Sequence, residues 1–285
     1  MKRAIVIYLE DNRNLMMMFG CLYTSYKYIE PKDTDLVVFG TPAALSKVPD
    51  DCIKVECQPA SDLPDWYNYR YINSISCLTG ENSDFLDKYD LLLRSDVDVF
   101  LTPAWNTFYP DLYTTGEGGY VNDEETKANL KRIAGIFGLK HKGIHNIGST
   151  HYGYAPLVRE VCKMSMKVAH HIFTKEFPPG EEGTWPGWYK GVTTMYSNEI
   201  AVNGLVEHVR IAPTKLDYYS TSENSVHNHP HIHCWHTDNM FSKFWFWAGR
   251  YDDMPTDNLD LDKIRDYCLY MALKSRKEMP WLSEL

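Results

Sequence analysis

Long hydrophobic runs are missing from this 285-residue sequence. No stretch approaches the ~20 consecutive apolar residues that cross a membrane, and the apolar run within the N-terminal MKRAIVIYLEDN is too short for a signal peptide. The sequence also has no Asn-x-Ser/Thr glycosylation acceptor, which is typical of a chain that never enters a secretory lumen. We therefore expect no membrane span and a cytoplasmic protein.

Paired cysteines are missing as well. The seven cysteines are scattered, odd in number and include no CxxC pair, a pattern that favours reduced thiols in the cytosol. Internal repeats, low-complexity tracts and linkers are also absent from the sequence. The length suits one large domain or two small ones, and we predict a single domain over residues 1–285.

Positive charge is scarce. The chain has 29 lysine and arginine residues against 38 aspartate and glutamate residues, a net charge of −9. This balance argues against binding to a nucleic-acid backbone or to an anionic membrane surface. A phosphorylated ligand would therefore need a local cation, either a metal ion or a few placed arginine and lysine side chains. Aromatic residues are plentiful, with 20 Tyr and 8 Trp, and their faces suit sugar rings and bases, although most will pack in the core.

The central feature of the sequence is the stretch 89–103, YDLLLRSDVDVFLTP. The apolar run 91–93 predicts a strand that is buried on both faces of a parallel sheet. Two carboxylates follow, Asp96 and Asp98, which point the same way if the backbone is extended. Adjacent carboxylates repel unless a hard cation lies between them and a substrate's phosphates, and ligands bind at the carboxyl ends of such strands. We interpret the pair as a metal–diphosphate site; the alternative is a charged turn after a core strand.

Strands and helices alternate along the first hundred residues. Residues 4–9 form a continuous apolar run, and residues 35–40 and 52–57 indicate two more strands. Apolar residues at helical spacing predict a helix from about Asp11, capped by Asp11 or Asn12. A β-α-β start with short connections predicts an α/β, Rossmann-type fold with a mostly parallel sheet and a right-handed crossover. Further helices are predicted at 66–78, at 123–139, from Pro156 onward, from Val192 to Val209 and from about 259 to 275.

Two later segments are candidates for contact with a substrate. The segment TTGEGGYV includes Gly118 and Gly119, which would let the backbone approach a ligand closely; the alternative is a bulged strand with a turn. The segment HNIGST sets Gly148 between Asn146 and Ser149, whose side chains can hydrogen-bond to hydroxyl groups.

Two further segments carry aromatic or polar side chains. The predicted helix at 66–78 offers Arg70 and Asn73, which would lie beside a bound nucleotide; the alternative is a solvated helix face. The segment FPPGEEGTWPGW predicts an irregular loop. In that loop Trp185 and Trp188 would form a lid or an acceptor platform.

The predicted helix at 192–209 carries a carboxylate, Glu199, on its apolar face. A buried carboxylate is costly unless it is paired or faces a polar cleft. Glu199 is therefore a candidate acid, base or charge stabiliser; the alternative is a structural salt bridge to an arginine or lysine. Farther along, HNHPHIHCWH (227–236) would place four alternating histidines on one side of an extended chain, a density typical of transition-metal binding.

Taken together, these segments resemble the glycosyltransferases of the GT-A type. In that family a Rossmann-like sheet has a central strand ending in an Asp-x-Asp motif, which holds Mn²⁺ or Mg²⁺ against the diphosphate of a nucleotide sugar. RSDVDVFLTP resembles that motif with its apolar flanks. HNIGST resembles the family's Asn-x-Gly segment, SNEIAVN its later acidic motif and HCWHT its late metal-binding histidine. The lack of a membrane anchor is similar to soluble bacterial members and to the soluble glycosyltransferases of large algal viruses.

The resemblance implies transfer of a sugar from a nucleoside diphosphate sugar, with UDP favoured, to a hydroxyl of a glycan or glycoprotein. This would take place in the cytoplasm, which for a viral enzyme is the host cytosol. Asp96, Asp98 and His236 would hold Mn²⁺ or Mg²⁺. Glu199 would either deprotonate the acceptor, giving inversion, or stabilise the oxocarbenium-like centre, giving retention. The implied donor contacts are Tyr8, Arg70, Asn73, Arg94, Ser95 and Asp96, and the implied sugar or acceptor contacts are Gly118, Gly119, Asn146, Gly148, Ser149, Trp185, Trp188 and Asp238.

The same resemblance divides the domain into a nucleotide-binding half at about 1–103, an acceptor half at about 104–250 and a helical closure at about 251–285. Two other function classes fit parts of the sequence. A metal-dependent hydrolase would use the His-rich stretch with Asp96 or Asp98 as a bridging ligand, although the sequence has no HExxH or HxH-x-DH pattern. A non-catalytic sugar-binding protein would keep the aromatic loop and would not need a metal–diphosphate site.

Overall fold

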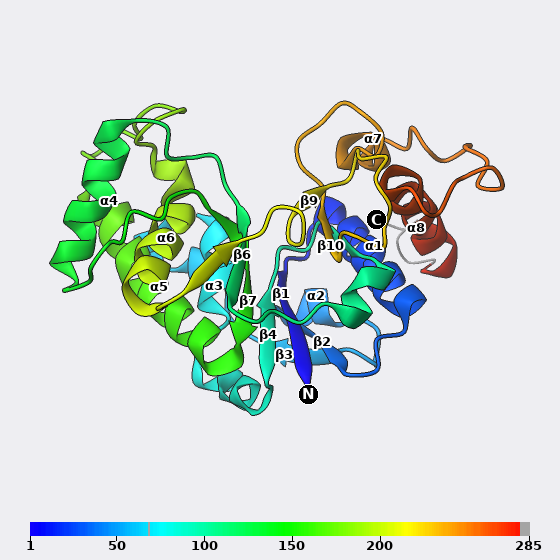
Figure 1. The fold of residues 1–285 in the computed structure, drawn as a ribbon, viewed down its shortest axis with the longest axis horizontal. Coiled ribbons are helices and arrows are strands. Elements are labelled where there is room, and N and C mark those ends of the chain that lie inside the picture. Colours follow the sequence, from blue (N-terminus) through cyan, green and yellow to red (C-terminus); the bar gives the residue numbers. More distant parts are fainter. Residues whose placement is uncertain (68, 280–285) are drawn as a thin grey trace. The chain divides into compact units, whose positions relative to one another are not determined.

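A computed structural model describes residues 1–67 and 69–279 and shows a mixed α/β fold (Figure 1). Its largest sheet has seven strands, in the order β3 (Ile53–Glu56), β2 (Thr34–Gly40), β1 (Arg3–Leu9), β4 (Leu91–Arg94), β7 (Ile147–Tyr154), β6 (Tyr113–Glu117) and β8 (Val209–Ile211). The pairs β1–β4, β2–β3 and β6–β8 are parallel, whereas β7 is antiparallel to both of its neighbours. The predicted α/β class with a mostly parallel sheet and flanking helices is therefore confirmed.

The chain folds into two compact units that alternate along the sequence. Unit 1 comprises Met1–Val6, Cys57–Arg94 and Pro110–Ile211, and unit 2 comprises Ile7–Glu56, Ser95–Tyr109 and Ala212–Leu285. The predicted single domain, with divisions near residues 103 and 250, stays a prediction. The last part of its helical closure, residues 280–285, lies outside the described residues.

Strand β4 is the apolar strand of the predicted central segment 89–103, and it pairs in parallel with β1. Arg3 of β1 is opposite Leu91 of β4, and Val6 is opposite Arg94. Every residue of both strands is buried, as the continuous apolar runs predict for a strand covered on both faces. Strand β4 ends at Arg94, so the two predicted carboxylates follow it directly.

In unit 1 three helices enclose an apolar core. These are α4 (Glu124–Ile136), α5 (Ala155–Lys175) and α6 (Thr193–Leu205). The side chain of Asp123 caps α4 by accepting a hydrogen bond from the backbone N–H of Thr126. Helix α6 ends earlier than predicted, because Val209 belongs to strand β8. The core between the helices contains Leu130, Ile133, Ala134, Val168, Ile172, Tyr196 and Ile200.

The predicted helix at 66–78 is wrong in length. The structure has two 3₁₀ turns, Pro64–Trp66 and Arg70–Ile72, followed by the single turn α3 (Asn73–Ser76). Tyr67 adopts the left-handed conformation, with φ 45°, and a right-handed helix cannot pass through such a residue. The apolar spacing of this segment therefore reflects packing of successive turns, not one continuous helix.

In unit 2 the long helix α1 (Arg13–Ile29) packs against α8 (Ile264–Glu278) and strand β5 (Val99–Leu101). The side chain of Asn12 caps α1 by accepting hydrogen bonds from two backbone N–H groups, as predicted. The short helices α2 (Pro42–Leu45) and α7 (Lys243–Trp247) complete the α-helices of this unit among the described residues. The C-terminal helix begins at Ile264 rather than near residue 259.

A second, three-stranded sheet in unit 2 was not predicted. Its order is β5, β10 (His231–His233) and β9 (Tyr218–Tyr219). Strand β5 pairs antiparallel with β10, with Leu101 opposite His231 and Val99 opposite His233. This pairing places the His-rich stretch beside the Asp-x-Asp motif.

Gly148 is required by the close approach of β6 and β7. A Cβ atom at this position would lie 2.4 Å from the carbonyl carbon of Gly116. The ladder is irregular here, with a register shift between Thr115 and Glu117, so the bulged-strand alternative describes this segment. Gly118 is also confined, because a Cβ there would lie 2.6 Å from the ring of Tyr120.

We expect Gly148→Ala to lower the free energy of unfolding by at least about 1–3 kcal/mol, because the added methyl group would push two paired strands apart. Gly119→Ala is the matched control, since a Cβ at Gly119 meets no atom within 4 Å. Its effect should stay within about 0.5 kcal/mol. Urea denaturation of both variants measures the difference, and equal stability would contradict the close-approach explanation.

Candidate functional site

The loop between β4 and β5 brings the two predicted carboxylates of unit 2 together. Residues 95–98 belong to no strand, and Val97 and Asp98 form a bend, so the convergence of Asp96 and Asp98 does not come from side chains that alternate along a strand. One ligand atom from each carboxylate and one from His233 all lie within 4.8 Å of one another. Two carboxylates and one imidazole are a donor set that accepts Mn²⁺.

His233, and not His236, lies with the two carboxylates among the described residues, and the metal-ligand role expected for His236 stays a prediction. The backbone N–H of Cys234 donates to the carbonyl oxygen of Asp98 at 2.9 Å, which fixes the end of β10 against the motif. The Nε2 atom of His233 lies 3.4 Å from Oδ1 of Asp98. Its Nδ1 atom is buried and has no hydrogen-bond partner among the described residues. His236 is exposed, and its ring packs against Phe244.

A buried lysine completes this cluster. The Nζ atom of Lys243, the first residue of α7, lies 2.6 Å from Oδ2 of Asp98. Burial alone would raise the pKa of Asp98, but the charges of His233 and Lys243 outweigh it and hold that pKa well below its usual range. Burial alone would likewise lower the pKa of His233, but Asp98 outweighs it and raises this pKa to about 9. The arrangement therefore concentrates positive charge around one carboxylate.

A chain of hydrogen bonds anchors the motif backbone to the small sheet. The backbone N–H of Asp217 donates to Nδ1 of His231 at 3.2 Å, and Nε2 of His231 lies 2.9 Å from Oγ of Ser95. The Ser95 hydroxyl donates to the carbonyl oxygen of Asp96 at 2.9 Å. Because Nδ1 of His231 accepts, the proton of the neutral ring is on Nε2, so this histidine cannot take a proton from Ser95. Burial lowers the pKa of His231 to about 3, which keeps the ring neutral.

The alternating histidines do not form one face. His227 is exposed and lies 3.6 Å from Asp262. His229 stacks on Tyr218 with ring centroids 3.6 Å apart. Only residues 231–233 of the stretch are extended, and their two histidines have different partners. The prediction of a one-sided histidine set is therefore wrong, because alternation holds only where the backbone is a strand.

Glu199 of α6 is the centre of a second cluster, which lies in unit 1. Its side chain is fully buried, as the apolar stripe predicted. Oε2 accepts hydrogen bonds from the Tyr120 hydroxyl and from the backbone N–H of Asn146, both at 2.8 Å. Oε1 lies 2.7 Å from Nδ1 of His145 and 3.3 Å from Nε2 of His141. In the described part of the chain no lysine or arginine pairs with Glu199, so the alternative of a salt bridge to one is not found.

The predicted sugar contact Asn146 has a structural part in this cluster. Its backbone is left-handed, with φ 60°, a conformation that asparagine tolerates better than most residues. Its side-chain oxygen accepts hydrogen bonds from the backbone N–H groups of Tyr120 and Val121 at 2.9 and 2.8 Å. The loop around residue 120 is thereby fixed beside Glu199.

Two predicted donor contacts in unit 1 are buried and already paired. The amide of Asn73 accepts from the backbone N–H of Ser61 and donates to its hydroxyl, both at 3.0 Å. The guanidinium of Arg94 donates to the carbonyl and hydroxyl oxygens of Ser74 and to the carbonyl oxygen of Ser149. These bonds give both side chains a role in holding loops together.

The remaining predicted contacts differ in exposure. Tyr8 is 9% exposed at the end of β1, whereas Arg70 and Asp238 are exposed. Trp185 is 49% exposed and is free of ring contacts among the described residues. Trp188 instead stacks on Phe177 and Tyr196, with centroids 5.5 and 4.6 Å apart, so it packs in unit 1.

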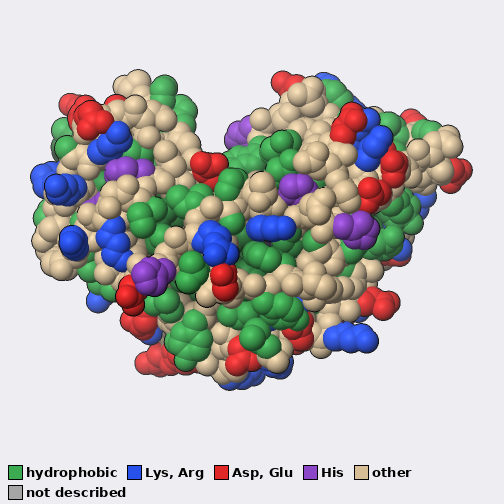
Figure 2. Space-filling view, viewed as in Figure 1, with side chains coloured by type: hydrophobic (Ala, Val, Ile, Leu, Met, Phe, Trp, Pro, Cys, Tyr) green, Lys and Arg blue, Asp and Glu red, His purple; other side chains and the backbone are tan. Residues whose placement is uncertain are grey.

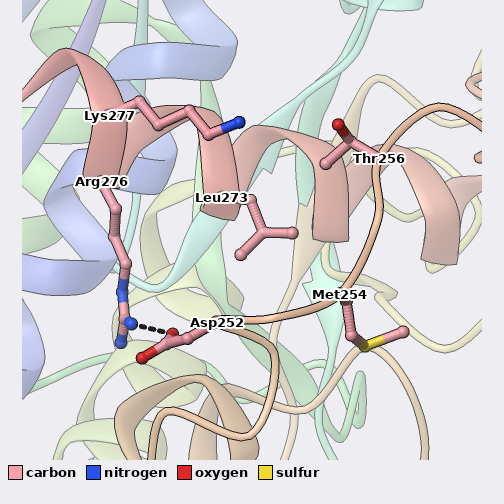
Figure 3. Close-up of a pocket in the computed structure, with 6 residues that line it drawn as sticks. All are labelled: Asp252, Met254, Thr256, Leu273, Arg276 and Lys277. Carbon is pink, nitrogen blue, oxygen red and sulfur yellow. Dashed lines mark hydrogen bonds and ion pairs between the residues drawn. The ribbon is translucent and has the colours of Figure 1, made fainter.

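A pocket beside α8 lies apart from all of these residues. It is lined by Asp252, Met254, Thr256, Leu273, Arg276 and Lys277 (Figure 3). Arg276 forms an ion pair with Asp252 inside it, and Lys277 is the third charged residue of the lining. On the face drawn in Figure 2, acidic and basic side chains are interspersed. A bound diphosphate would therefore depend on cations placed at its own site.

The sequence of residues 1–281 matches a family model described as a domain of unknown function, DUF7164. The chain belongs to the DUF7164 family. A comparison with curated proteins gives no match. No helix in the described part of this DUF7164 protein is both long and apolar enough to cross a membrane, and all seven cysteines are free.

Solved structures are similar to this DUF7164 protein. The galactosyltransferase LgtC, in complex with donor and acceptor sugar analogues, has 14% identity and a TM-score of 0.51, and the match covers 99% of this chain and 100% of that one. An active-site mutant of LgtC has 15% identity and a TM-score of 0.46 over 92% and 83% of the two chains. The bifunctional glycosyltransferase WbbM has 13% identity and a TM-score of 0.49 over 99% and 51%. The first of these shows the fold, and the predicted GT-A-like architecture is confirmed.

We expect Glu199→Gln to lower the free energy of unfolding by about 1–3 kcal/mol, because one acceptor oxygen becomes an amide that faces hydrogen-bond donors. Glu160→Gln on α5 is the matched control, since the Glu160 side chain is 61% exposed, and its effect should be within about 0.5 kcal/mol. Chemical denaturation measures both. A Glu199→Gln protein as stable as the control would show that the three hydrogen-bond partners of Glu199 do not depend on the carboxylate.

Proposed function

We propose that this protein is a metal-dependent glycosyltransferase, which moves a sugar from a nucleoside diphosphate sugar to a hydroxyl of a glycan or glycoprotein. The observation that carries the proposal is the convergence of Asp96, Asp98 and His233 directly after the buried strand β4. Ligands of open α/β sheets bind at the carboxyl ends of strands, and the shared fold of LgtC supports the same class of reaction. UDP is the favoured nucleotide, and the seven free thiols fit a reducing compartment such as the cytosol.

Asp96, Asp98 and His233 would hold Mn²⁺ or Mg²⁺. The carboxylates offer the oxygens that both ions prefer, and His233 would offer a ring nitrogen when the ion displaces the proton from it. A bound ion supplies Lewis-acid stabilisation of the charge on a departing diphosphate. Lys243, whose Nζ lies 2.6 Å from Oδ2 of Asp98, would contact the phosphate oxygens when the ion compensates the charge of that carboxylate.

The identity of the donor can be tested by thermal shift with a panel of nucleotide sugars, each with and without Mn²⁺. A ligand at 100 times its dissociation constant stabilises the folded state by about 2.7 kcal/mol. We expect stabilisation by UDP-sugars that needs the ion and is lost in Asp96→Asn. Stabilisation by free sugars alone, without any nucleotide, would favour the sugar-binding alternative.

Substitution of each of two nearby histidines distinguishes the proposed ligand, His233, from its exposed neighbour, His236. We expect His233→Ala to raise the Mn²⁺ concentration for half-maximal activity at least about tenfold, as loss of a group supporting a metal site does. His236→Ala should change it much less, because His236 lies outside the three-residue group. A titration of activity against Mn²⁺ for both variants decides between them, and the opposite order would restore His236 as the ligand.

The hydrolase alternative predicts a different metal. Only His233 of the His-rich stretch joins the carboxylates, whereas His231 is committed to Ser95. A zinc hydrolase would draw on several nitrogen ligands. Activity that requires Zn²⁺ and is lost in His231→Ala or His229→Ala would support the hydrolase instead of the transferase.

A further inference from the structure

The segment between α4 and β7 carries two histidines, His141 and His145, whose ring nitrogens meet the carboxylate of Glu199 on α6. One ligand atom from each of the three side chains lies within 4.8 Å of the other two. Nδ1 of His145 is 2.7 Å and Nε2 of His141 is 3.3 Å from the same oxygen, Oε1 of Glu199. All three residues belong to unit 1, so the cluster is complete within that unit.

Hydrogen bonds within the protein account for only part of this arrangement. Oε2 of Glu199 accepts from the Tyr120 hydroxyl and from the backbone N–H of Asn146, and Oε1 is paired with His145. Nε2 of His141 has no hydrogen-bond partner among the described residues, although this side chain is only 2% exposed. A buried polar atom without a partner is costly and requires an explanation. A cation bound between this nitrogen and Oε1 would provide one.

We propose that His141, His145 and Glu199 form a Zn²⁺ site in unit 1. Tetrahedral nitrogen and oxygen ligands lie about 2.0–2.2 Å from zinc, which places neighbouring ligand atoms roughly 3.3 Å from each other. The contact between His141 and Glu199 already has this length, and the 2.7 Å contact of His145 would lengthen slightly around the ion. The inference does not rest on the proposed glycosyl transfer, because none of the three residues belongs to the metal group proposed for that reaction.

The donor set distinguishes this site from the one at Asp96 and Asp98. Two imidazole nitrogens with one carboxylate oxygen suit Zn²⁺, whereas two carboxylates with one imidazole suit Mn²⁺. The same set of two histidines and one carboxylate can hold Fe²⁺ with several open positions. Here the side chains of His141 and Glu199 are 2% and 0% exposed, against 23% for His145. Because little room is left for further ligands, we expect Zn²⁺ with a water molecule at its fourth position.

The hydrogen bonds around the three side chains would hold them in place for an ion. Asn203, one helical turn after Glu199, accepts from the backbone N–H groups of Lys142 and Ile144 at 3.0 and 3.1 Å. Its amide also donates to the carbonyl oxygen of Ile144 at 2.8 Å. The segment between the two histidines is thereby tied to α6. Partners of this kind orient the ligands of a metal site.

Binding of an ion requires one rearrangement at His141. In the structure the backbone N–H of Gly143 donates to Nδ1 of His141 at 3.1 Å, so the proton of a neutral ring is on Nε2. An ion needs the lone pair of Nε2, and the proton must then lie on Nδ1. Gly143 would release this bond, and its backbone can change readily because it is an exposed glycine with φ 82°.

Retention of zinc tests the site. The full-length protein is treated with EDTA, loaded with Zn²⁺ and freed of excess ion by gel filtration, and its zinc content is then measured. We expect the wild-type protein to retain an equimolar amount, as should His208→Ala, the control at a side chain that is 72% exposed. His145→Ala should bind Zn²⁺ at least about tenfold more weakly, since even the loss of an outer partner of a ligand has this effect. Equal affinity in the two variants would overturn the inference.

Asp96→Asn assigns the retained zinc to one of the two candidate sites. This variant leaves His141, His145 and Glu199 intact, so it should retain Zn²⁺ as the wild-type protein does. Loss of zinc in Asp96→Asn but not in His145→Ala would place the ion at the Asp-x-Asp motif and would overturn the inference. A protein that retains zinc in the expected pattern but uses no nucleotide sugar would keep this site, while the proposed function fails.

A spectroscopic measurement on the wild-type protein does not depend on the folding of any variant. In NMR spectra of the full-length protein, Zn²⁺ should shift the ring ¹⁵N resonances of His141 and His145. It should also shift the backbone N–H resonance of Gly143, which loses its acceptor when the proton of His141 moves to Nδ1. Mg²⁺, which prefers oxygen ligands, should leave these resonances in place. Resonances that stay unchanged in excess Zn²⁺ would overturn the inference.

Discussion

The negative charge of Asp98, whose side chain is only 15% exposed, is the constraint on which the candidate metal site of unit 2 depends. A charge that is withdrawn from water is costly unless partners compensate it. Strand β10 supplies His233 and helix α7 supplies Lys243, whose Nζ is 2.6 Å from the carboxylate although 145 positions separate the two residues in the chain. The same strand ties its backbone to that of Asp98 through Cys234. One carboxylate thus fixes the relative positions of a loop, a strand and a helix, and it leaves a concentration of positive charge suited to phosphate.

Much of this fold could be predicted from short-range patterns. The uninterrupted apolar run before the motif required a strand buried on both faces, and β4 is buried throughout. The apolar spacing of a helix and its N-cap are equally local patterns. The sequence alone therefore indicated Asn12 as a cap and Asp123 as the start of a helix, and both are N-caps in the structure. The position of His233 beside Asp98 could not be predicted in this way. It depends on the antiparallel pairing of β5 with β10, two three-residue strands whose partnership no local periodicity reveals.

The Glu199 cluster shows the same division between local and long-range information. An acidic residue within an apolar stripe predicted a buried carboxylate that needs partners, and the structure contains one. The expected partner was an arginine or lysine. The structure instead places the Tyr120 hydroxyl, the backbone N–H of Asn146 and the ring of His145 around it, on loops whose conformation depends on left-handed backbone at Asn146. Several hydrogen bonds to one carboxylate can replace a counter-charge, and no sequence spacing indicates when they do.

The most direct test of a metal–diphosphate site is the release of UDP during turnover. It is measured for the wild-type protein and for Asp96→Asn at a temperature where both are folded. With a UDP-sugar, an acceptor glycan and Mn²⁺, the wild-type protein should release UDP, and excess EDTA should abolish the release. Asp96→Asn should release almost none while its melting temperature stays close to that of the wild type. Full UDP release in EDTA, or by Asp96→Asn, would contradict a function in which these carboxylates hold the metal against the diphosphate.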